Sequence, residues 1–465
     1  MALSWYPGKT SIEYTHSKEP LILPSKSGSA PSRALPELIK DVVPDCTLNP
    51  LLFNGHLQTF WTASNKGGPP IHYKRRTFES SDSRFAGHYT VDLAVAPPKK
   101  AVTKAEDGGP EDEGLREDPV GVGHHRLPPR TTYFTNKEFE NLGSEDTKPL
   151  IIALHGLSGG SYEVYLRHVL APLVVETAEG EGLGGLSGGD WEALVVNSRG
   201  CAGSKITSSI LYNARATWDM RQTVKWCRET WPKRPLYAIG FSLGANILAN
   251  YLGEEGSNSL LSAAIVVSNP WKLEISSMVL RRSYVGLNVY STAMGTSLRK
   301  LFDTHREQMT HIDPANIAKV KYLHEFDREV QCPTWGYPTE GAYYRDASSA
   351  DSVLNIRTPT LCLHARDDPI AADEAVPYEE IAQNPYVVMC ATGGGGHLSW
   401  FEWDGGRWHA KPAVAFLNAM ARGVDSSKIE MPNSMSELPA NPSGHKMPFV
   451  FEPMRRKCHL ADGEH

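Results

Sequence analysis

The chain has 465 residues, of which 40% are hydrophobic, so it can bury the core of one large domain with extensions or of two domains. Its formal net charge of −6 shows no excess of Lys and Arg. This argues against a nucleic acid as partner, because such binding depends on basic side chains that neutralise phosphates. The seven cysteines are scattered and include no C-x-x-C pair, so the sequence predicts neither a metal site nor a disulfide framework. We also expect no cofactor.

The beginning of the chain lacks a basic region followed by an apolar stretch, and no run reaches the roughly 18 apolar residues of a membrane-spanning helix. We therefore expect an intracellular, cytoplasmic protein. Peripheral contact with a membrane or a lipid droplet is compatible with this expectation, and the sequence does not determine the oligomeric state.

Changes in composition divide the chain into parts. Residues 1–60 are rich in Pro and Ser, which predicts an arm packed on a core domain at residues 61–422, followed by a tail at residues 423–465. Within the core domain, a polar insertion at about 97–130 offers too little apolar surface to offset its ordering entropy. The segment from Gly180 to Asp190 is dense in glycine, and we expect surface loops at both places.

Short apolar runs alternate with helical patterns along the core domain. Runs that are apolar on both faces and separated by helices are typical of a buried parallel sheet, here a doubly wound one. The predicted strands lie in residues 149–156, 192–200, 236–242, 263–270, 358–365 and 386–392, and the predicted helices in 161–175, 215–229, 243–252 and 411–421. The alternation stops at about residues 271–349, where helical, aromatic-rich sequence predicts a cap over a site.

The most informative segment of the core joins an apolar run to a helix of small residues through G-F-S-L-G, with Ser242 at its centre. A G-x-S-x-G turn between strand and helix holds the serine in a strained conformation and exposes its hydroxyl at the edge of the sheet. The flanking Gly240 and Gly244 let neighbouring backbone pass close by. Ser242 is therefore a candidate nucleophile.

A serine nucleophile requires a base and an acid, and both are expected at the carboxyl ends of later strands. The acid lies in A-R-D-D-P after a buried strand, where Asp367 and Asp368 are both possible; we predict Asp368, because Asp367 can simply end the strand or cap a turn. The base is His397, which follows four consecutive glycines after the last core strand. Such a run costs conformational entropy, so it predicts a close backbone approach to a ligand or a sharp reorientation of the histidine.

The loop L-H-G-L-S-G-G-S after the first core strand is a candidate oxyanion hole. We expect the backbone N–H groups of Leu157 and Leu243 to point at the carbonyl oxygen of a substrate. The alternative, a phosphate cradle, is disfavoured because the loop lacks both the Gly-Lys-Ser/Thr ending of a P-loop and the spacing of G-x-G-x-x-G. The N-S-R-G-C segment after the second core strand is expected to anchor a loop and to take no part in chemistry.

Several of these segments together resemble the α/β-hydrolase family that groups bacterial esterase-like proteins, mammalian phospholipase-like members and fungal medium-chain fatty acid ethyl ester synthase/esterases. The resemblance covers about Asn49 to Ala421. The segments that carry it are N-P-L-L-F-N-G-H-L-Q-T-F-W, L-H-G-L-S-G-G-S, N-S-R-G-C-A-G-S, G-F-S-L-G-A-N, A-R-D-D-P and G-G-H. It implies an α/β-hydrolase fold, here with the helical cap predicted above, and a triad of Ser242, Asp368 and His397. For His56 and Gln58 of H-L-Q-T we expect packing of the arm on the sheet.

These observations predict a serine hydrolase or acyltransferase that acts on carboxylic esters through an acyl-enzyme. The resemblance to the fungal members implies medium-chain fatty acyl esters and transfer to water or to a small alcohol. The expected partner is thus a small-molecule acyl ester or a lipid. A catalytically silent lipid-binding or scaffold protein on the same fold is the alternative, and peptidase activity is a third option that the fold permits.

Overall fold

The computed structural model of the chain describes residues 8–27, 31–97, 115–175, 189–432 and 452–454. Most of the predicted glycine-dense loop and tail, part of the polar insertion and the first residues of the arm therefore lie outside the described residues. The strands are β1 (Lys9–Thr10), β2 (Ile12–Thr15), β3 (Ile22–Leu23), β4 (Arg33–Ala34), β5 (Cys46–Thr47), β6 (His72–Glu79), β7 (His88–Val95), β8 (Thr131–Tyr133), β9 (Leu150–Leu154), β10 (Glu192–Asn197), β11 (Leu236–Phe241), β12 (Leu261–Val267), β13 (Thr360–Ala365) and β14 (Val387–Thr392).

The described chain contains α-helices of four to fourteen residues. They are α1 (Leu35–Val42), α2 (Gly55–Ser64), α3 (Asn136–Glu140), α4 (Val164–Val174), α5 (Thr217–Thr230), α6 (Leu243–Glu255), α7 (Leu273–Arg282), α8 (Thr292–Thr304), α9 (Pro314–Ile317), α10 (Leu323–Phe326), α11 (Cys332–Trp335), α12 (Glu340–Ala347), α13 (Tyr378–Gln383) and α14 (Ala410–Gly423). Two further segments, Gly286–Ser291 and Asp327–Gln331, are π-helical. No helix in these ranges is both long enough and apolar enough to cross a membrane.

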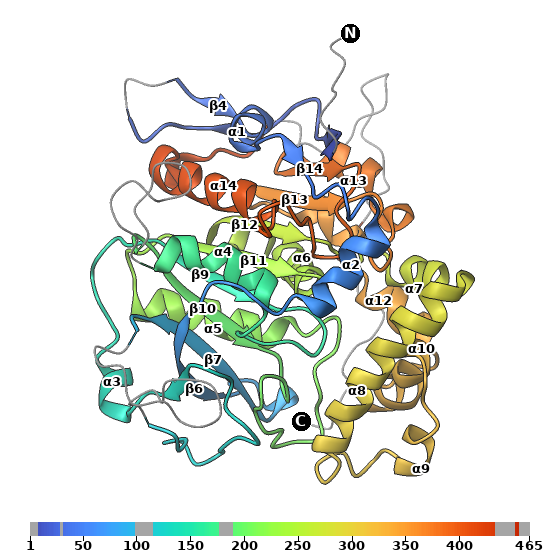
Figure 1. Cartoon of the computed structure of the whole chain (residues 1–465). Coiled ribbons are helices and arrows are strands. Elements are labelled where there is room, and N and C mark those ends of the chain that lie inside the picture. Colours follow the sequence, from blue (N-terminus) through green and yellow to red (C-terminus); the bar gives the residue numbers. More distant parts are fainter. Residues whose placement is uncertain (1–7, 28–30, 98–114, 176–188, 433–451, 455–465) are drawn as a thin grey trace.

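One large sheet organises the described chain (Figure 1). Its strands follow the order β2-β14-β13-β12-β11-β9-β10-β7-β6-β8, and the six from β14 to β10 are parallel. Helices α4 and α14 pack together on one face and α5 and α6 pack together on the other. The doubly wound, mostly parallel sheet predicted from the sequence is confirmed, because parallel strands connected by helices need both faces covered.

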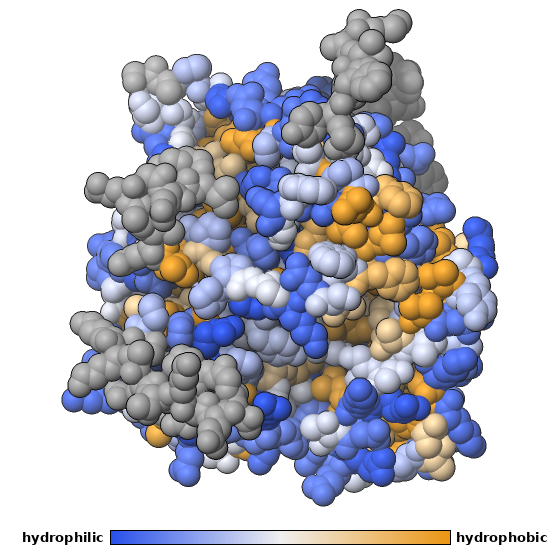
Figure 2. All heavy atoms as spheres, in the orientation of Figure 1, coloured by the Kyte–Doolittle hydropathy of each residue, from blue (hydrophilic) through white to orange (hydrophobic). Residues whose placement is uncertain are grey.

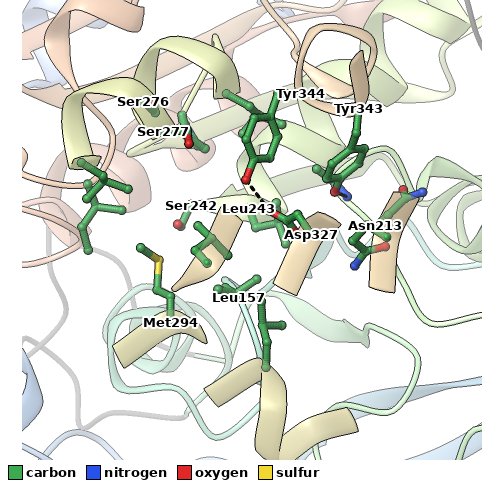
Figure 3. Close-up of a pocket in the computed structure, with 18 of the residues that line it drawn as sticks. Leu157, Asn213, Ser242, Leu243, Ser276, Ser277, Met294, Asp327, Tyr343 and Tyr344 are labelled. Carbon is green, nitrogen blue, oxygen red and sulfur yellow. Dashed lines mark hydrogen bonds between the residues drawn. The ribbon is translucent and has the colours of Figure 1, made fainter. Parts of the chain in front are cut away.

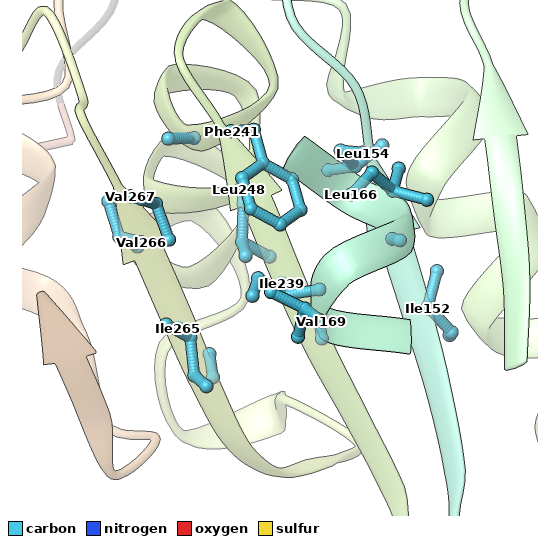
Figure 4. Packing of buried hydrophobic residues seen from close by; sticks show 14 of the residues in the cluster. Ile152, Leu154, Leu166, Val169, Ile239, Phe241, Leu248, Ile265, Val266 and Val267 are labelled. Carbon is cyan, nitrogen blue, oxygen red and sulfur yellow. The ribbon is translucent and has the colours of Figure 1, made fainter. Parts of the chain in front are cut away.

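The core lies between the central strands and the helices that cover them (Figure 4). Strands β9, β11 and β12 are almost wholly buried, which is why their sequences read as unbroken apolar runs. Side chains of α4 and α6 fill the two sides of this sheet, and among them are Leu166, Val169 and Leu248. This packing fixes the carboxyl ends of the strands, where the candidate site lies.

The antiparallel strands β6 and β7 extend the sheet, and neither was predicted from the sequence. Strand β6 contains Lys-Arg-Arg, yet its burial alternates along the strand and Arg75 is fully buried. The Arg75 guanidinium forms a two-point ion pair with the buried Asp92 carboxylate of β7, with N–O distances of 2.7 and 2.8 Å. A search for apolar runs misses a strand that contains a charged residue unless the ion-pair partner of that residue is known.

The amino-terminal arm becomes part of the sheet. Strand β2 pairs antiparallel with β14 at one edge, and α1 packs against α14. Helix α2 runs across the boundary expected after residue 60, so arm and core are joined by a continuous helix. The arm therefore approaches the carboxyl end of β14, close to the segment that carries His397.

The helices between β12 and β13 gather on one side of the sheet (Figure 1). They run from α7 to α12 and include both π-helical segments. This is the stretch in which the sequence predicted a cap. The consequence for the site is that side chains of α7, α8 and α12 face Ser242 across a cleft.

Candidate active site

Ser242 lies on a sharp turn between β11 and α6. Its backbone adopts φ 54° and ψ −119°, a strained conformation for a residue other than glycine, and its N–H donates to Val267 O at 2.9 Å. Gly244 allows the turn to pack closely on the end of β9, because a Cβ there would lie 2.5 Å from the carbonyl oxygens of Leu154 and His155. The half-buried serine hydroxyl is thereby presented at the edge of the sheet.

The structure brings Ser242, His397 and Asp368 into one chain of hydrogen bonds. His397 Nε2 lies 2.8 Å from Ser242 Oγ, and His397 Nδ1 lies 2.8 Å from Asp368 Oδ2 and 3.1 Å from its Oδ1. The Asp368 carboxylate is fully buried and accepts the N–H groups of Ile370 and Ala371. These contacts orient the imidazole so that its Nε2 can accept a proton from the serine hydroxyl.

Asp367, the other carboxylate that the sequence offered, has a different role. Its Oδ1 accepts the backbone N–H of Gly396 at 2.9 Å, and none of its described hydrogen bonds reaches His397. Burial raises the pKa of Asp367 above its usual value. Asp367 therefore holds the glycine loop that precedes the histidine, while Asp368 contacts the histidine itself.

The glycine loop is shaped by a close approach to α2. A Cβ on Gly396, whose φ is +61°, would lie 2.6 Å from Gly55 O and 2.8 Å from Thr59 Oγ1. A Cβ on Gly55 would in turn lie 1.8 Å from the carbonyl oxygen of Asp367. The close neighbour of this glycine loop is therefore the arm, and the close approach to a ligand expected from the four glycines stays a prediction.

Helix α2 also bonds directly to the segment around His397. Thr59 Oγ1 accepts the backbone N–H of His397 at 3.0 Å, and Gln58 Oε1 accepts that of Phe401 at 2.8 Å. The exposed His56 reaches the cap instead, where its Nδ1 lies 2.9 Å from Tyr290 Oη. The expectation for His56 and Gln58 was packing of the arm on the sheet, whereas the H-L-Q-T segment contacts the histidine loop and the cap. Only its unusual sequence could have pointed to these contacts.

The loop that follows β9 leaves the amide of Leu157 free beside the serine. Gly156 N–H donates to Tyr165 Oη, Ser158 N–H to Tyr212 Oη, and Ser161 N–H to Asn197 Oδ1. Leu157 N–H, between them, and Leu243 N–H, at the first position of α6, donate no hydrogen bond within the described residues. Both leucines line the same cleft as Ser242.

His155 and the N-S-R-G-C segment hold this loop from behind. Burial lowers the pKa of His155 to about 4, so its ring is neutral, with Nδ1 2.7 Å from Gly156 O. Its Nε2 accepts the backbone N–H of Ser198. The next residue, Arg199, forms a buried two-point ion pair with Asp219. These contacts agree with an anchoring role for the segment.

A cleft opens in front of Ser242 (Figure 3). Its apolar lining includes Leu273, Leu280, Met294, Leu298 and Leu323, all from the cap. Among the described residues, no three His, Cys, Asp or Glu side chains gather in a way that could hold a metal ion.

Residues 149–403 match the model of the α/β hydrolase fold. A monoacylglycerol lipase of Saccharomyces cerevisiae is 35% identical over 398 residues, which cover 82% of this chain and 84% of the relative. Medium-chain fatty acid ethyl ester synthase/esterase 2 of the same yeast is 32% identical over 398 residues, covering 80% and 84%. Phospholipase ABHD3 of Mus musculus is 32% identical over 273 residues, covering 58% and 62%. The chain belongs to the α/β hydrolase fold family.

Proposed function

We propose that this protein is a serine carboxylic ester hydrolase with Ser242, His397 and Asp368 as its catalytic triad. The observation that carries the proposal is the continuous chain of hydrogen bonds from Ser242 Oγ through both imidazole nitrogens to the Asp368 carboxylate. Relatives named as a lipase and as an ester synthase/esterase support the same reaction class.

The reaction follows from the geometry. Ser242 Oγ attacks the ester carbonyl while His397 Nε2 takes the hydroxyl proton, and Asp368 stabilises the imidazolium that forms. The electron pair moves to the carbonyl oxygen, which accepts hydrogen bonds from the N–H groups of Leu157 and Leu243. When the intermediate collapses, the C–O bond to the alcohol breaks and His397 gives its proton to the leaving oxygen, which leaves an acyl-enzyme. Water or a small alcohol then attacks the acyl-enzyme with His397 again as base.

Medium-chain acyl groups are the proposed substrates. The apolar cap residues of the cleft would remove the chain from water, and each buried methylene contributes about 0.8 kcal/mol. An eight-carbon chain thus gains roughly 5 kcal/mol over an acetyl group. Hydrolysis of a series of acyl esters, with ethanol titrated against water, would measure both the preferred chain and the preferred acceptor.

An active-site probe tests the enzyme itself. A fluorophosphonate reacts with an activated serine, so wild-type protein should be labelled and the Ser242→Ala variant should not. Folded wild-type protein that stays unlabelled and cleaves no acyl ester would favour the alternative, a silent lipid-binding protein on this fold.

Contact with a lipid surface is also proposed, through a group of exposed side chains that we call the apolar patch. Its members are Leu51, Phe53, Phe60 and Trp61, which are exposed by 70%, 77%, 41% and 48%. They lie on α2 and the turn before it, beside the cap, since Phe60 stacks on Tyr290. Figure 2 shows apolar side chains gathered on the surface in this region. Exposed apolar side chains near a cleft for acyl chains are suited to insertion into the surface of a lipid layer.

A further inference from the structure

One buried carboxyl group in the cleft lacks the basic or imidazole partner that the other buried aspartates have. Five aspartates of the described chain are buried, and four of them pair with a basic or imidazole side chain. The pairs are Asp92 with Arg75, Asp219 with Arg199, Asp346 with Arg215, and Asp368 with His397. The fifth, Asp327, is 6% exposed and forms no ion pair with any described residue. Buried carboxylates are normally paired, so Asp327 requires an explanation.

Asp327 lies where a ligand can reach it. It begins the π-helical segment Asp327–Gln331 of the cap, and both of these residues line the cleft in front of Ser242. Insertions of π-helix are rare and occur frequently at functional sites. Figure 3 shows the Tyr344 hydroxyl pointing at the Asp327 carboxyl, and Tyr344 Oη donates to Asp327 Oδ2 at 2.6 Å. A carboxylate can accept several hydrogen bonds, so capacity remains for a ligand.

A second polar group in the cleft also lacks a partner. Ser276 of α7 is 4% exposed and lines the cleft, and its Oγ has no hydrogen-bond partner among the described residues. Because a buried hydroxyl without a partner is unfavourable, a bound ligand would stabilise it. The polar groups Asp327, Tyr344 and Ser276 of the cleft thus come from three different cap elements.

We infer that Asp327 and Tyr344, with Ser276, form a subsite that binds a free hydroxyl group in the alcohol portion of the ester, as a glycerol ester would offer. The inference rests on the proposed hydrolase function. An anionic group is disfavoured in this subsite by repulsion from the carboxylate, and a hydrocarbon would leave Tyr344 as the only described side-chain partner of the buried carboxyl. Burial raises the pKa of Asp327 to about 7, and at neutral pH both of its forms can accept a hydrogen bond from a hydroxyl.

Two substrates that differ only in hydroxyl groups test the subsite. 1-Decanoylglycerol and propyl decanoate carry the same acyl chain, and propanol lacks both free hydroxyls of glycerol. Wild-type protein should have the higher kcat/KM for the glycerol ester. In Asp327→Leu the ratio of the two kcat/KM values should fall about 10- to 100-fold, as expected for a lost hydrogen bond to a charged group. Asp327→Asn should restore part of the ratio, because its amide oxygen also accepts a hydrogen bond.

Controls separate this inference from the proposed function. Glu329→Gln removes a carboxylate from the same π-helical segment but outside the cleft lining, and it should keep the wild-type ratio. Fluorophosphonate labelling reports whether each variant folds with a reactive Ser242; should Asp327→Leu fail to fold, Tyr344→Phe provides the test.

Wild-type protein that is neither labelled nor active contradicts the hydrolase. Active protein with no preference for the glycerol ester, or a ratio unchanged in Asp327→Leu, overturns the subsite. A loss confined to substrates with a quaternary ammonium group would assign Asp327 to a cation instead and also overturns it.

Discussion

The two neighbouring carboxylates Asp367 and Asp368 contact different groups, and this predicts different effects when each is substituted. Asp368→Asn replaces the acceptor of the His397 Nδ1 proton and should lower kcat by about 10³- to 10⁴-fold, because the imidazole is then held in the wrong tautomer. Asp367→Asn keeps an oxygen for the Gly396 N–H and should retain most of the activity. Steady-state kinetics of both variants on one acyl ester measure the difference. The reverse order of losses would make Asp367 the catalytic acid.

His155 predicts a pH dependence of stability. Its pKa is about 4 in the folded protein and 6.5 ordinarily, because burial disfavours the charged form of the ring. The unfolded chain therefore binds a proton more readily, so the contribution of His155 is complete above pH 6.5 and is lost as the pH falls through 4. The difference in unfolding free energy between wild type and His155→Gln should shrink by about 3 kcal/mol from pH 7 to pH 4. Urea unfolding of both proteins tests this, and a difference that stays constant contradicts a neutral, titrating His155.

Single residues also show what the sequence could and could not predict. Ser242 and His397 stood in recognisable contexts, a G-x-S-x-G turn and a glycine run after the last core strand. The choice between Asp367 and Asp368 rested on a local argument, and their contacts appear only in the folded chain. Asp327 could not be predicted from the sequence, because its burial and its lack of an ion-pair partner depend on residues that are distant in the chain.

Helix α2 provides the next prediction, since it supports the loop of the catalytic histidine. Thr59→Val keeps the size of the side chain but leaves the backbone N–H of His397 without its acceptor. An unsatisfied buried N–H costs about 1–3 kcal/mol, so we expect kcat to fall roughly 10-fold as His397 moves out of line.

The control for this helix is Thr59→Ser, which retains the hydroxyl and should restore kcat close to that of wild type. Kinetics with separate kcat and KM, together with the unfolding temperature, distinguish a displaced histidine from a general loss of stability. An unchanged kcat in Thr59→Val would show that α2 does not position His397.

Whole elements were predictable where burial is uniform. The predicted strand at residues 236–242 and helix at 243–252 correspond to β11 and α6, because both elements are buried almost throughout. Strands β6 and β7 were missed since a buried Arg–Asp pair interrupts the apolar pattern. Strand β2 was missed because an edge strand of four half-buried or exposed residues has no strong pattern of its own.

In the molecule as a whole, the apolar patch belongs to a helix that also contacts the histidine loop and the cap. Thr59 of α2 bonds to the backbone of His397, and the exposed His56 contacts Tyr290 of the cap. Contact with lipid would therefore touch the elements that surround the cleft. The net charge of −6 offers no attraction to anionic lipids, so the binding should depend on apolar contact and only weakly on salt.

Removal of apolar side chains from the patch tests this contact. Leu51 and Phe53 are exposed by 70% and 77%, so Leu51→Ser/Phe53→Ser should leave the unfolding temperature unchanged. Because full burial of each side chain gains about 1.5–3 kcal/mol, partial insertion predicts a loss of at least about 10-fold in binding to phosphatidylcholine vesicles. Co-sedimentation at low and high salt measures it. The matched control is Leu260→Ser, exposed by 40% just before β12 and thus at the opposite end of the strands from the site. Equal losses in both variants, or binding abolished by salt alone, would contradict an apolar docking surface at α2.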